Sequence, residues 1–383
     1  MKSVGIICEY NPFHNGHLYH LNKVKELYPD FTIILVMSGN FLQRGESSII
    51  DKWSKTKIAL EHGIDLVVEL PYAFSSQSAD LFARGSIELL DHLKVDAIVF
   101  GSETNDIDLL TKIADLSMSD NFNESVKSYM DLGFSYPKAL SEAINKTTGD
   151  NVDTPNDILG ISYIKELKRL NSSIKPVTIK RTNNYHSLEL NNDIVSASSI
   201  RKALLDGIDV INYVPENSYK YLKKELHFID NYFSLLKYKI LSEIDTLNVY
   251  QTVDEGIENR IKKYIIHSKS LDELIMNIKT KRYTYNKIRR MLTHILCNFT
   301  KEEANNFEHI EYVRVLGFTN NGKQYLSKIK KDLLIPLITN YSKLNNKMLD
   351  LEFRVTCVYA SILNEKDKIN LIESEYKNHP LIK

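Results

Sequence analysis

The sequence predicts an α/β fold, in which a first domain built on a Rossmann-like parallel sheet is followed by a mainly α-helical C-terminal domain. Three observations support this prediction. Short apolar runs alternate with helical segments over the first half of the chain, the connections between them are short, and strand signals fade after about residue 205. Strand–helix–strand order with short connections is typical of a parallel sheet with helices on both faces.

The expected strands are short apolar runs that end at turn residues. The run at 31–37 is closed by Ser38-Gly39-Asn40, and the run that begins at Leu66 is stopped by Pro71. The expected helices have apolar residues at helical spacing, and one of them would be capped by Asp51 and ended by Gly63. We expect strands at 4–8, 31–37, 66–71, 97–101 and 175–181, and helical segments at 18–27, 51–62, 78–93, 103–150 and 155–170.

The length of 383 residues favours two domains, because single cores rarely grow beyond about 250–300 residues. We place the boundary where the strand signals fade, which gives a first domain at 1–205 and a second at 206–383.

The composition excludes several classes of protein. With 43% hydrophobic and 26% charged residues the chain is neither disordered nor fibrous. Its three cysteines, Cys8, Cys297 and Cys357, lie far apart and have no zinc-site spacing. Neither a signal-peptide core nor a run of about 18 apolar residues is found, so we expect a cytoplasmic protein with no membrane partner.

The net charge of zero conceals an asymmetry between the two halves. Residues 1–200 hold 19 Lys and Arg against 26 Asp and Glu, a difference of −7, and residues 201–383 hold the remaining 30 against 23, a difference of +7. The second half is therefore the better candidate for binding a polyanion.

The most informative motif is His14-Asn15-Gly16-His17, between the first expected strand and the first expected helix. In an open parallel sheet, ligands bind beyond the carboxyl ends of the strands, where helix N–H groups favour phosphate. His14 and His17 are three residues apart and can reach the same anion from one helix face. Two alternatives stay open: the histidines are cap and surface residues, or they bind a metal, although no third ligand is evident.

A second candidate is Ser196-Ala197-Ser198-Ser199-Ile200-Arg201, just before a helical stretch. Hydroxyl groups at a helix start and the Arg201 guanidinium can bind phosphate, whereas the alternative is a plain serine N-cap with a surface arginine. Three further residues lie at ends of expected elements: Gly101 ends a strand, Asn156 opens a helix, and Arg181 ends another strand. A turn, a helix cap and a strand end explain these residues equally well without a ligand. The loop 43–46 also opens on this edge of the sheet and could order an acyl substrate or a base.

The densest basic stretch is 280–290, where Lys and Arg alternate with tyrosines. Basic side chains contact RNA phosphates and aromatic rings stack on splayed bases. A solvated helix face would give a similar pattern.

His14-Asn15-Gly16-His17 is similar to the His-x-Gly-His signature of the nucleotidyltransferase and class I aminoacyl-tRNA synthetase superfamily, and Ser196 to Arg201 resembles its second signature. The stretches 4–21, 37–46 and 69–71 more particularly resemble the bacterial tRNA(Met) cytidine acetate ligase family, and the resemblance runs over the full chain. No Lys-Met-Ser-Lys-Ser sequence is present, which disfavours a true aminoacyl-tRNA synthetase.

The resemblance implies ATP as a substrate, with Mg²⁺ expected beside it but no protein ligands visible, and tRNA binding by the second domain. It assigns catalytic roles to His14 and His17. The residues it assigns to ATP are Ile7, Cys8, Glu9, Tyr10, Asn11, Pro12, Phe13, His14, Asn15, Gly16, His17, Leu18, Tyr19, His20, Gly101, Asn156, Arg181, Ser198 and Arg201. The residues we expect to bind tRNA are Lys281, Arg282, Tyr283, Lys287, Arg289 and Arg290.

The implied activity is ATP-dependent activation of acetate as acetyl-adenylate, with transfer of the acetyl group to N4 of the wobble cytidine of elongator tRNA(Met), which forms N4-acetylcytidine. In this interpretation His14 and His17 stabilise the triphosphate as pyrophosphate leaves, and Ser198 and Arg201 hold its far end. Two alternatives remain: a small-molecule adenylyltransferase of the same superfamily, and a nucleotide-responsive RNA-binding module without catalysis.

Overall fold

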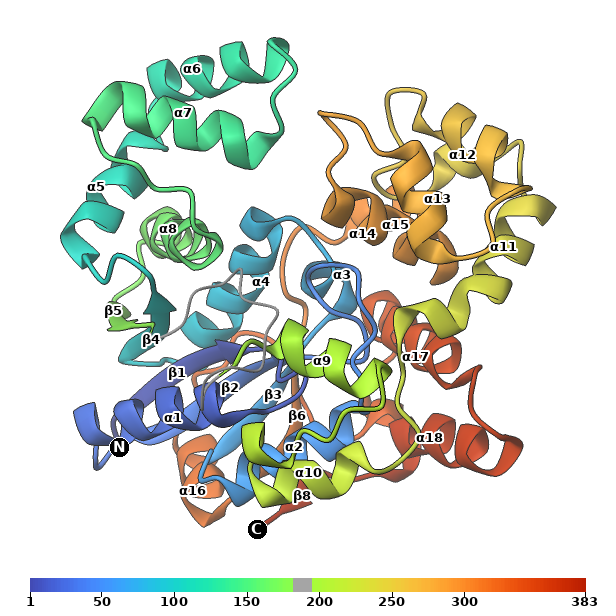
Figure 1. The fold of residues 1–383 in the computed structure, drawn as a ribbon. Helices are drawn as coiled ribbons and strands as arrows, with labels where there is room; N and C mark the ends of the chain where they lie inside the picture. The colour runs from blue at the N-terminus through green and yellow to red at the C-terminus, as the bar shows by residue number, and fades with distance from the viewer. Residues whose placement is uncertain (182–194) are drawn as a thin grey trace.

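Strands from both halves of the chain lie side by side in one mixed sheet (Figure 1). The computed structural model describes residues 1–181 and 195–383. The strands found there are β1 (Ser3–Cys8), β2 (Thr32–Ser38), β3 (Leu66–Leu70), β4 (Ala97–Ser102), β5 (Lys175–Lys180), β6 (Val313–Phe318), β7 (Leu337–Ile338) and β8 (Leu381–Ile382). Their order is β5-β4-β1-β2-β3-β6-β7, and β8 pairs with β6.

The strands of the first half are all parallel, as their connections through helices require. The register pairs Ser3 with Thr32 at one end of β1 and β2 and Cys8 with Met37 at the other. The carboxyl ends of these strands therefore meet at one edge of the sheet.

Helices cover both faces of the sheet and continue into a separate helical group. Those of the first half are α1 (Asn15–Leu27), α2 (Lys52–Glu61), α3 (Tyr72–Ser75), α4 (Ala79–His92), α5 (Ile107–Leu116), α6 (Asp120–Asp131), α7 (Tyr136–Thr148), α8 (Pro155–Arg169) and α9 (Ala197–Leu205). Those of the second half are α10 (Glu216–Leu222), α11 (Phe233–Ser242), α12 (Ile257–Ile265), α13 (Leu271–Ile278), α14 (Tyr285–Leu296), α15 (Lys301–Asn306), α16 (Asn320–Ile329), α17 (Lys347–Ala360) and α18 (Glu365–Lys377). Short 3₁₀ turns lie at Ile211–Tyr213, Ile229–Tyr232, Leu247–Val249 and Tyr341–Lys343.

The two faces of the sheet follow from the alternation of side chains along β2. Ile33 and Leu35 pack with residues of α1 and α2 in one cluster. Ile34 and Val36, which point the other way, pack with α4 and α8 in a second cluster that continues into the C-terminal helices. A run that is apolar at every position is what a strand buried on both faces requires.

The predicted α/β fold class is confirmed, and so are the five strands and the helical segments of the first half. The helical region at 103–150 resolves into α5, α6 and α7, of which α6 and α7 stand away from the sheet (Figure 1). In the described ranges no helix is both long enough and apolar enough to cross a membrane.

The strands of the second half were missed by the sequence analysis. β6 pairs antiparallel with β3, so the sheet crosses the boundary that we place at 205. Arg314 interrupts the apolar run of β6, and β7 and β8 have only two residues each, too few to give a pattern. The boundary itself stays a prediction, but the second half is not helical throughout.

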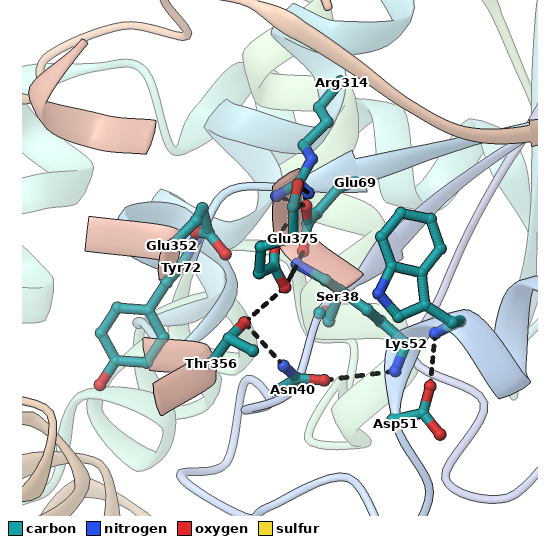
Figure 2. A network of polar contacts seen from close by, with 12 residues as sticks. Ser38, Asn40, Asp51, Lys52, Glu69, Tyr72, Arg314, Glu352, Thr356 and Glu375 are labelled. Atoms are coloured by element: carbon teal, nitrogen blue, oxygen red, sulfur yellow. Dashed lines mark hydrogen bonds and ion pairs between the residues drawn. The ribbon is translucent and has the colours of Figure 1, made fainter. Parts of the chain in front are cut away.

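A buried network of charges holds β6 and α18 against the first half (Figure 2). Lys52 Nζ lies 2.7 Å from Glu69 Oε1 and 2.8 Å from Glu375 Oε1. Arg314 contacts the same two carboxylates, at 3.0 Å from Glu69 and 2.6 Å from Glu375. All four side chains are at most 3% exposed. Because each charge has two partners of opposite sign, burial leaves none of them uncompensated.

Candidate active site

A cavity of about 280 Å³ opens at the carboxyl ends of β1, β4 and β5. Its walls come from the turn between β1 and α1, the loop 43–46 after β2, α8, and the segment that leads into α9. This is the edge of a parallel sheet at which ligands bind.

Most of the residues that the sequence assigns to ATP line this one cavity. They come from the β1–α1 segment and from four more distant segments of the chain. Those that line it are Ile7, Cys8, Glu9, Tyr10, Asn11, His14, Gly16, His17, Tyr19, His20, Gly101, Asn156, Arg181, Ser198 and Arg201.

Four assigned residues of the β1–α1 segment, Pro12, Phe13, Asn15 and Leu18, are not part of the cavity wall. Phe13 is fully buried and stacks on His62, with 4.6 Å between the ring centroids. Asn15 Nδ2 donates to the carbonyl of Asn212 at 2.9 Å. The contact with ATP that we predict for these four residues therefore stays a prediction.

The β1–α1 turn is held in place by Asn11. Its Oδ1 accepts a hydrogen bond from Ile49 N–H at 2.8 Å, and its main-chain carbonyl accepts one from Arg201 at 2.8 Å. The side chain of Asn11 thus fixes the turn to the segment after β2, and the main-chain carbonyl of Asn11 ties the turn to α9.

His14 is both the N-cap of α1 and a cavity residue. Its Nδ1 accepts a hydrogen bond from Gly16 N–H at 3.0 Å, so the proton of the neutral ring is on Nε2. His14 N–H in turn lies 3.4 Å from Nδ1 of His17, which favours the same tautomer there. The ring centroids are 4.0 Å apart. An Nε2–H donor of His14 is therefore available at the helix start, so capping and ligand binding are compatible in this histidine.

Both rings are electrically neutral at ordinary pH. Burial lowers the pKa of His14 to about 3, with a smaller contribution from Arg181 and Arg201, and burial also holds the pKa of His17 well below its usual range. His20 follows the same trend, with a pKa lowered by burial to about 4, and its buried Nε2 has no hydrogen-bond partner within the described residues. A neutral imidazole keeps one N–H donor, so it can form a hydrogen bond to an anion without first gaining a proton.

Arg201 lies in the cavity wall and not on the surface. Its guanidinium contacts Glu46 at 2.6 Å, the carbonyl of Asn11 and, at 3.3 Å, Ser198 Oγ. Ser196, the N-cap of α9, accepts from Ser199 N–H at 3.1 Å. The capping role thus falls to Ser196, which leaves Ser198 and Arg201 to face the cavity.

Arg181 and Asn156 meet at a shared carboxylate. Asn156 Nδ2 donates to Glu103 Oε1 at 2.5 Å, and Arg181 Nε lies 3.5 Å from the same oxygen. Thr154, and not Asn156, is the N-cap of α8, so the alternative of a simple cap for Asn156 is wrong. A Cβ at Gly101 would lie 3.1 Å from Arg181 Cγ, so this glycine leaves room for the arginine.

Several cavity residues were not assigned by the sequence analysis. Gln43, Arg44 and Glu46 belong to a loop considered only as a possible acyl or base site, and Lys180 only as a neighbour of Arg181. The others are Phe82, Phe100, Leu159, Tyr163, Ile179, Val195, Ser196 and Ala197. The apolar ones carry no distinguishing signal, because a strand or helix residue that faces a cavity reads like one that faces the core.

The basic stretch lies at the start of α14 and is only partly exposed. Lys281 and Arg282 are exposed, and Arg282 pairs with Glu255 at 3.0 Å. Tyr283 is only 4% exposed and donates its hydroxyl to a main-chain carbonyl, so its ring is packed inside the helical group, and its contact with tRNA stays a prediction. Lys287 Nζ lies 3.8 Å from the centre of that ring.

The two arginines of this stretch reach back toward the cavity. Arg289 pairs with Glu46 at 2.9 Å and donates to the carbonyl of Arg44 at 2.8 Å. Arg290 is half-buried, and its backbone packs against Gly45. The stretch is therefore more than a solvated or positively charged surface, because Arg289 and Arg290 join the helical group to the loop 43–46 of the active site.

Metal ligands do not gather in the part of the chain that the structure describes. No group of three His, Cys, Asp or Glu side chains there could hold a metal ion. The cavity carboxylates, Glu9 and Glu46, therefore do not form a Mg²⁺ site by themselves.

The fold and the cavity define a nucleotidyltransferase-type α/β protein with a His-x-Gly-His motif at its first βα turn. The model of the family described as HIGH Nucleotidyl Transferase matches residues 1–374. The tRNA(Met) cytidine acetate ligases of Anoxybacillus flavithermus and Caldicellulosiruptor bescii are each 41% identical to this chain, over all of it and over 100% and 98% of their own lengths.

Two crystal structures of Thermotoga maritima TmcAL are similar over the whole chain and 99% of their own length, at 32% identity. The apo form has a TM-score of 0.91, and the form bound with alpha-thio ATP has a TM-score of 0.89. The chain belongs to the HIGH nucleotidyl transferase family and, within it, to the tRNA(Met) cytidine acetate ligase family.

Proposed function

We propose that this chain is an ATP-dependent ligase that acetylates N4 of the wobble cytidine of elongator tRNA(Met), using acetate activated as acetyl-adenylate. Full-length similarity to enzymes of that name supports the proposal. The observation that carries it is the pair of neutral histidines in a cavity that also holds Arg181 and Arg201. This is a donor set suited to a triphosphate, and the T. maritima relative binds an ATP analogue.

In the first step an acetate oxygen attacks the α-phosphorus of ATP, and the bond to the β-phosphate bridging oxygen breaks. Negative charge moves onto pyrophosphate as it leaves. His14 and His17 donate from Nε2 to phosphate oxygens, and these bonds strengthen as the charge grows. Arg201, which pairs with Glu46 in this structure, turns part of its guanidinium to the phosphates.

In the second step the cytidine amine attacks the acetyl carbonyl carbon and AMP leaves. Activation is needed because acetate is a poor electrophile and an exocyclic cytosine amine is a poor nucleophile. The tRNA approaches along the start of α14, where Lys281, Arg282 and Lys287 neutralise phosphates, and Arg289 and Arg290 join this stretch to the loop 43–46. Mg²⁺ would accompany ATP and would neutralise part of the phosphate charge, and the reaction takes place in the cytoplasm, where tRNA and ATP are found.

The test is to incubate the protein with ATP and labelled acetate, with and without total tRNA. We expect label in tRNA as N4-acetylcytidine and, without tRNA, ATP–pyrophosphate exchange that depends on acetate. Exchange that requires a different small acid would indicate a small-molecule adenylyltransferase. Tight RNA binding with no turnover would indicate a binding module.

A variant test uses His17→Ala, with the exposed Glu26→Gln on the same helix as the control. Loss of one positioned charge-stabilising donor lowers the rate by about 100-fold or more, so we expect exchange to fall by that amount while the circular dichroism spectrum is unchanged. Acetyl-adenylate formation at the wild-type rate in His17→Ala would disprove the role given to this ring.

A further inference from the structure

Glu9 lies between two sides of the cavity that differ in their side chains. β1 is flanked by β4 on one side and by β2 on the other. Of the residues assigned to ATP from distant segments, Gly101 lies in β4 and Arg181 follows β5, on the first side, whereas Arg201 pairs with Glu46 on the second side. The loop 43–46 follows β2 on the second side, and Glu9, directly after β1, is bonded to it: Glu9 Oε1 accepts from Gln43 N–H at 2.7 Å.

The position of Glu9 is fixed by contacts at its backbone and at one carboxylate oxygen. Lys55 Nζ donates to the carbonyl of Glu9 at 3.0 Å and to those of Ser38 and Gly39 at 2.8 and 2.9 Å, which ties the ends of β1 and β2 together. Among the described residues, the other carboxylate oxygen, Oε2, accepts no hydrogen bond. A fixed carboxylate with one oxygen free in a cavity can accept a donor from a ligand.

The second side of the cavity is the side that an RNA on α14 would reach. Arg289 donates to the carbonyl of Arg44, and Thr293 Oγ1 donates to the carbonyl of Gly45 at 2.9 Å. The loop 43–46 is therefore the direct connection between the predicted tRNA-binding stretch and Glu9.

Cytosine presents the groups that this side of the cavity would bind. Its N4 amine is a donor, and acidic side chains accept from it. The Arg44 guanidinium, which also lines the cavity, supplies positive charge for the ring N3 and O2 acceptors. Uracil carries an acceptor in place of the amine, which a carboxylate would repel.

We propose that Glu9 binds the N4 amine of the target cytidine and accepts its proton during acetyl transfer. This inference rests on the proposed function. The N4 lone pair forms a bond to the carbonyl carbon of acetyl-adenylate, and the bond from that carbon to the adenylate oxygen breaks with its electron pair leaving on AMP. One N4 proton passes to the Glu9 carboxylate and from there to water.

The other groups in the cavity are less suited to this role. Glu46 is held between Arg201 and Arg289, and although burial opposes it, these cations keep the pKa of its carboxyl below the usual value. Burial lowers the pKa of His14 to about 3 and that of His20 to about 4, which makes them weaker bases.

Glu9 differs because burial raises its pKa, against smaller opposing effects from its hydrogen bond and nearby cations. The titratable and charged groups that act on it or feel its charge come from β1, the loop 43–46, α2 and α8. They are Cys8, Arg44, Glu46, Lys55 and Tyr163.

The experiment separates the two half-reactions in Glu9→Gln, whose amide keeps an acceptor for Gln43 N–H. Because Glu9 is also among the residues assigned to ATP, we expect acetate-dependent ATP–pyrophosphate exchange to fall in this variant, but by much less than acetyl transfer does. Transfer from preformed acetyl-adenylate to tRNA should fall by about 100-fold or more, the range of a lost general base. Glu9→Asp should keep part of the transfer, and Glu26→Gln should match wild type in both assays.

A pH profile gives an independent measurement on the wild-type protein. With preformed acetyl-adenylate, the transfer rate should fall tenfold per pH unit on the acid side as one group is protonated, and Glu9→Gln should lack this dependence. Transfer at the wild-type rate in Glu9→Gln, or equal losses in exchange and transfer, would disprove the role of Glu9 but would leave the proposed function standing. Wild-type protein without acetate-dependent exchange would remove the proposed function, and the inference with it.

Discussion

His14 shows how one residue serves the fold and the site together. The N-cap position places its ring beside the first N–H groups of α1, and the bond from Gly16 N–H fixes the tautomer that leaves Nε2–H for a ligand. Glu46 likewise joins Arg201 to Arg289 by two ion pairs. At this scale the sequence identified the histidines and Arg201, because they belong to short local motifs.

The lowered pKa of His14 predicts a pH dependence of stability. In the unfolded chain this ring takes up a proton near pH 6.5, whereas the folded ring stays neutral until about pH 3. Protonation therefore favours the unfolded state, and the stability contributed by the neutral ring, which is full above pH 6.5, is lost as the pH falls toward 3.

Ring-proton NMR signals of His14 in the folded protein should not move between pH 8 and pH 5. The same signals in the urea-unfolded chain should titrate. A folded-state midpoint near 6.5 would contradict the burial described above.

At the scale of elements, the loop between β2 and α2 is clamped on α14. Phe41 and Ser47 pair across its base, Gly45 N–H donates to the carbonyl of Leu42, and Thr293 holds the carbonyl of Gly45. This packing brings an active-site loop and a helix about 245 residues later into contact. Local sequence patterns single out the loop 43–46 and the basic stretch 280–290 separately but contain no information about their contact.

Gly45→Ala should disrupt this clamp. Gly45 has φ +70°, and a Cβ there would lie 2.4 Å from Arg290 N, so both backbone strain and a clash with backbone atoms result. We expect a loss of about 1–3 kcal/mol in the free energy of unfolding for the overpacking alone, together with reduced acetyl transfer.

The matched control is Gly133→Ala. Gly133 has φ +88° but no atom within 4 Å of a Cβ, so only the left-handed backbone is penalised, at about 1–2 kcal/mol. Urea unfolding of both variants measures the difference. Equal losses of unfolding free energy in the two variants would show that the contact between Gly45 and α14 contributes nothing to stability.

At the scale of the whole molecule, the buried charges unite the two halves of the chain. Lys52 and Glu69 come from α2 and β3, and Arg314 and Glu375 come from β6 and α18 (Figure 2). Although burial opposes it, the attraction of Arg314 and Lys52 lowers the pKa of Glu375. The return of the C-terminal segment to the sheet thus depends on charges that are neutralised only in the folded state.

Glu375→Ala should lower the free energy of unfolding by about 3–5 kcal/mol, because it leaves Arg314 and Lys52 buried with one carboxylate fewer. The matched variant is Glu352→Gln. Burial, with a smaller effect of Glu69, raises the pKa of Glu352 to about 8, so an amide replaces a mostly neutral acid and still accepts from Tyr72 N–H. We expect a loss below about 1 kcal/mol for this variant in urea unfolding. A similar loss for both would contradict the roles assigned to these two carboxylates.

The sequence by itself determined the alternation of strands and helices in the first half and the identity of the motif residues around His14 and Arg201. Short stretches of sequence are enough to predict both features. Apolar periodicity predicts the strands and helices, and residue types at fixed spacing identify the motifs. Only the tertiary structure decided that β6 to β8 complete the sheet, that Tyr283 is buried, and that the loop 43–46 joins α14 to Glu9. These features depend on contacts between residues distant in the sequence, and a buried charge such as Arg314 reads as a surface residue until its partners are brought beside it.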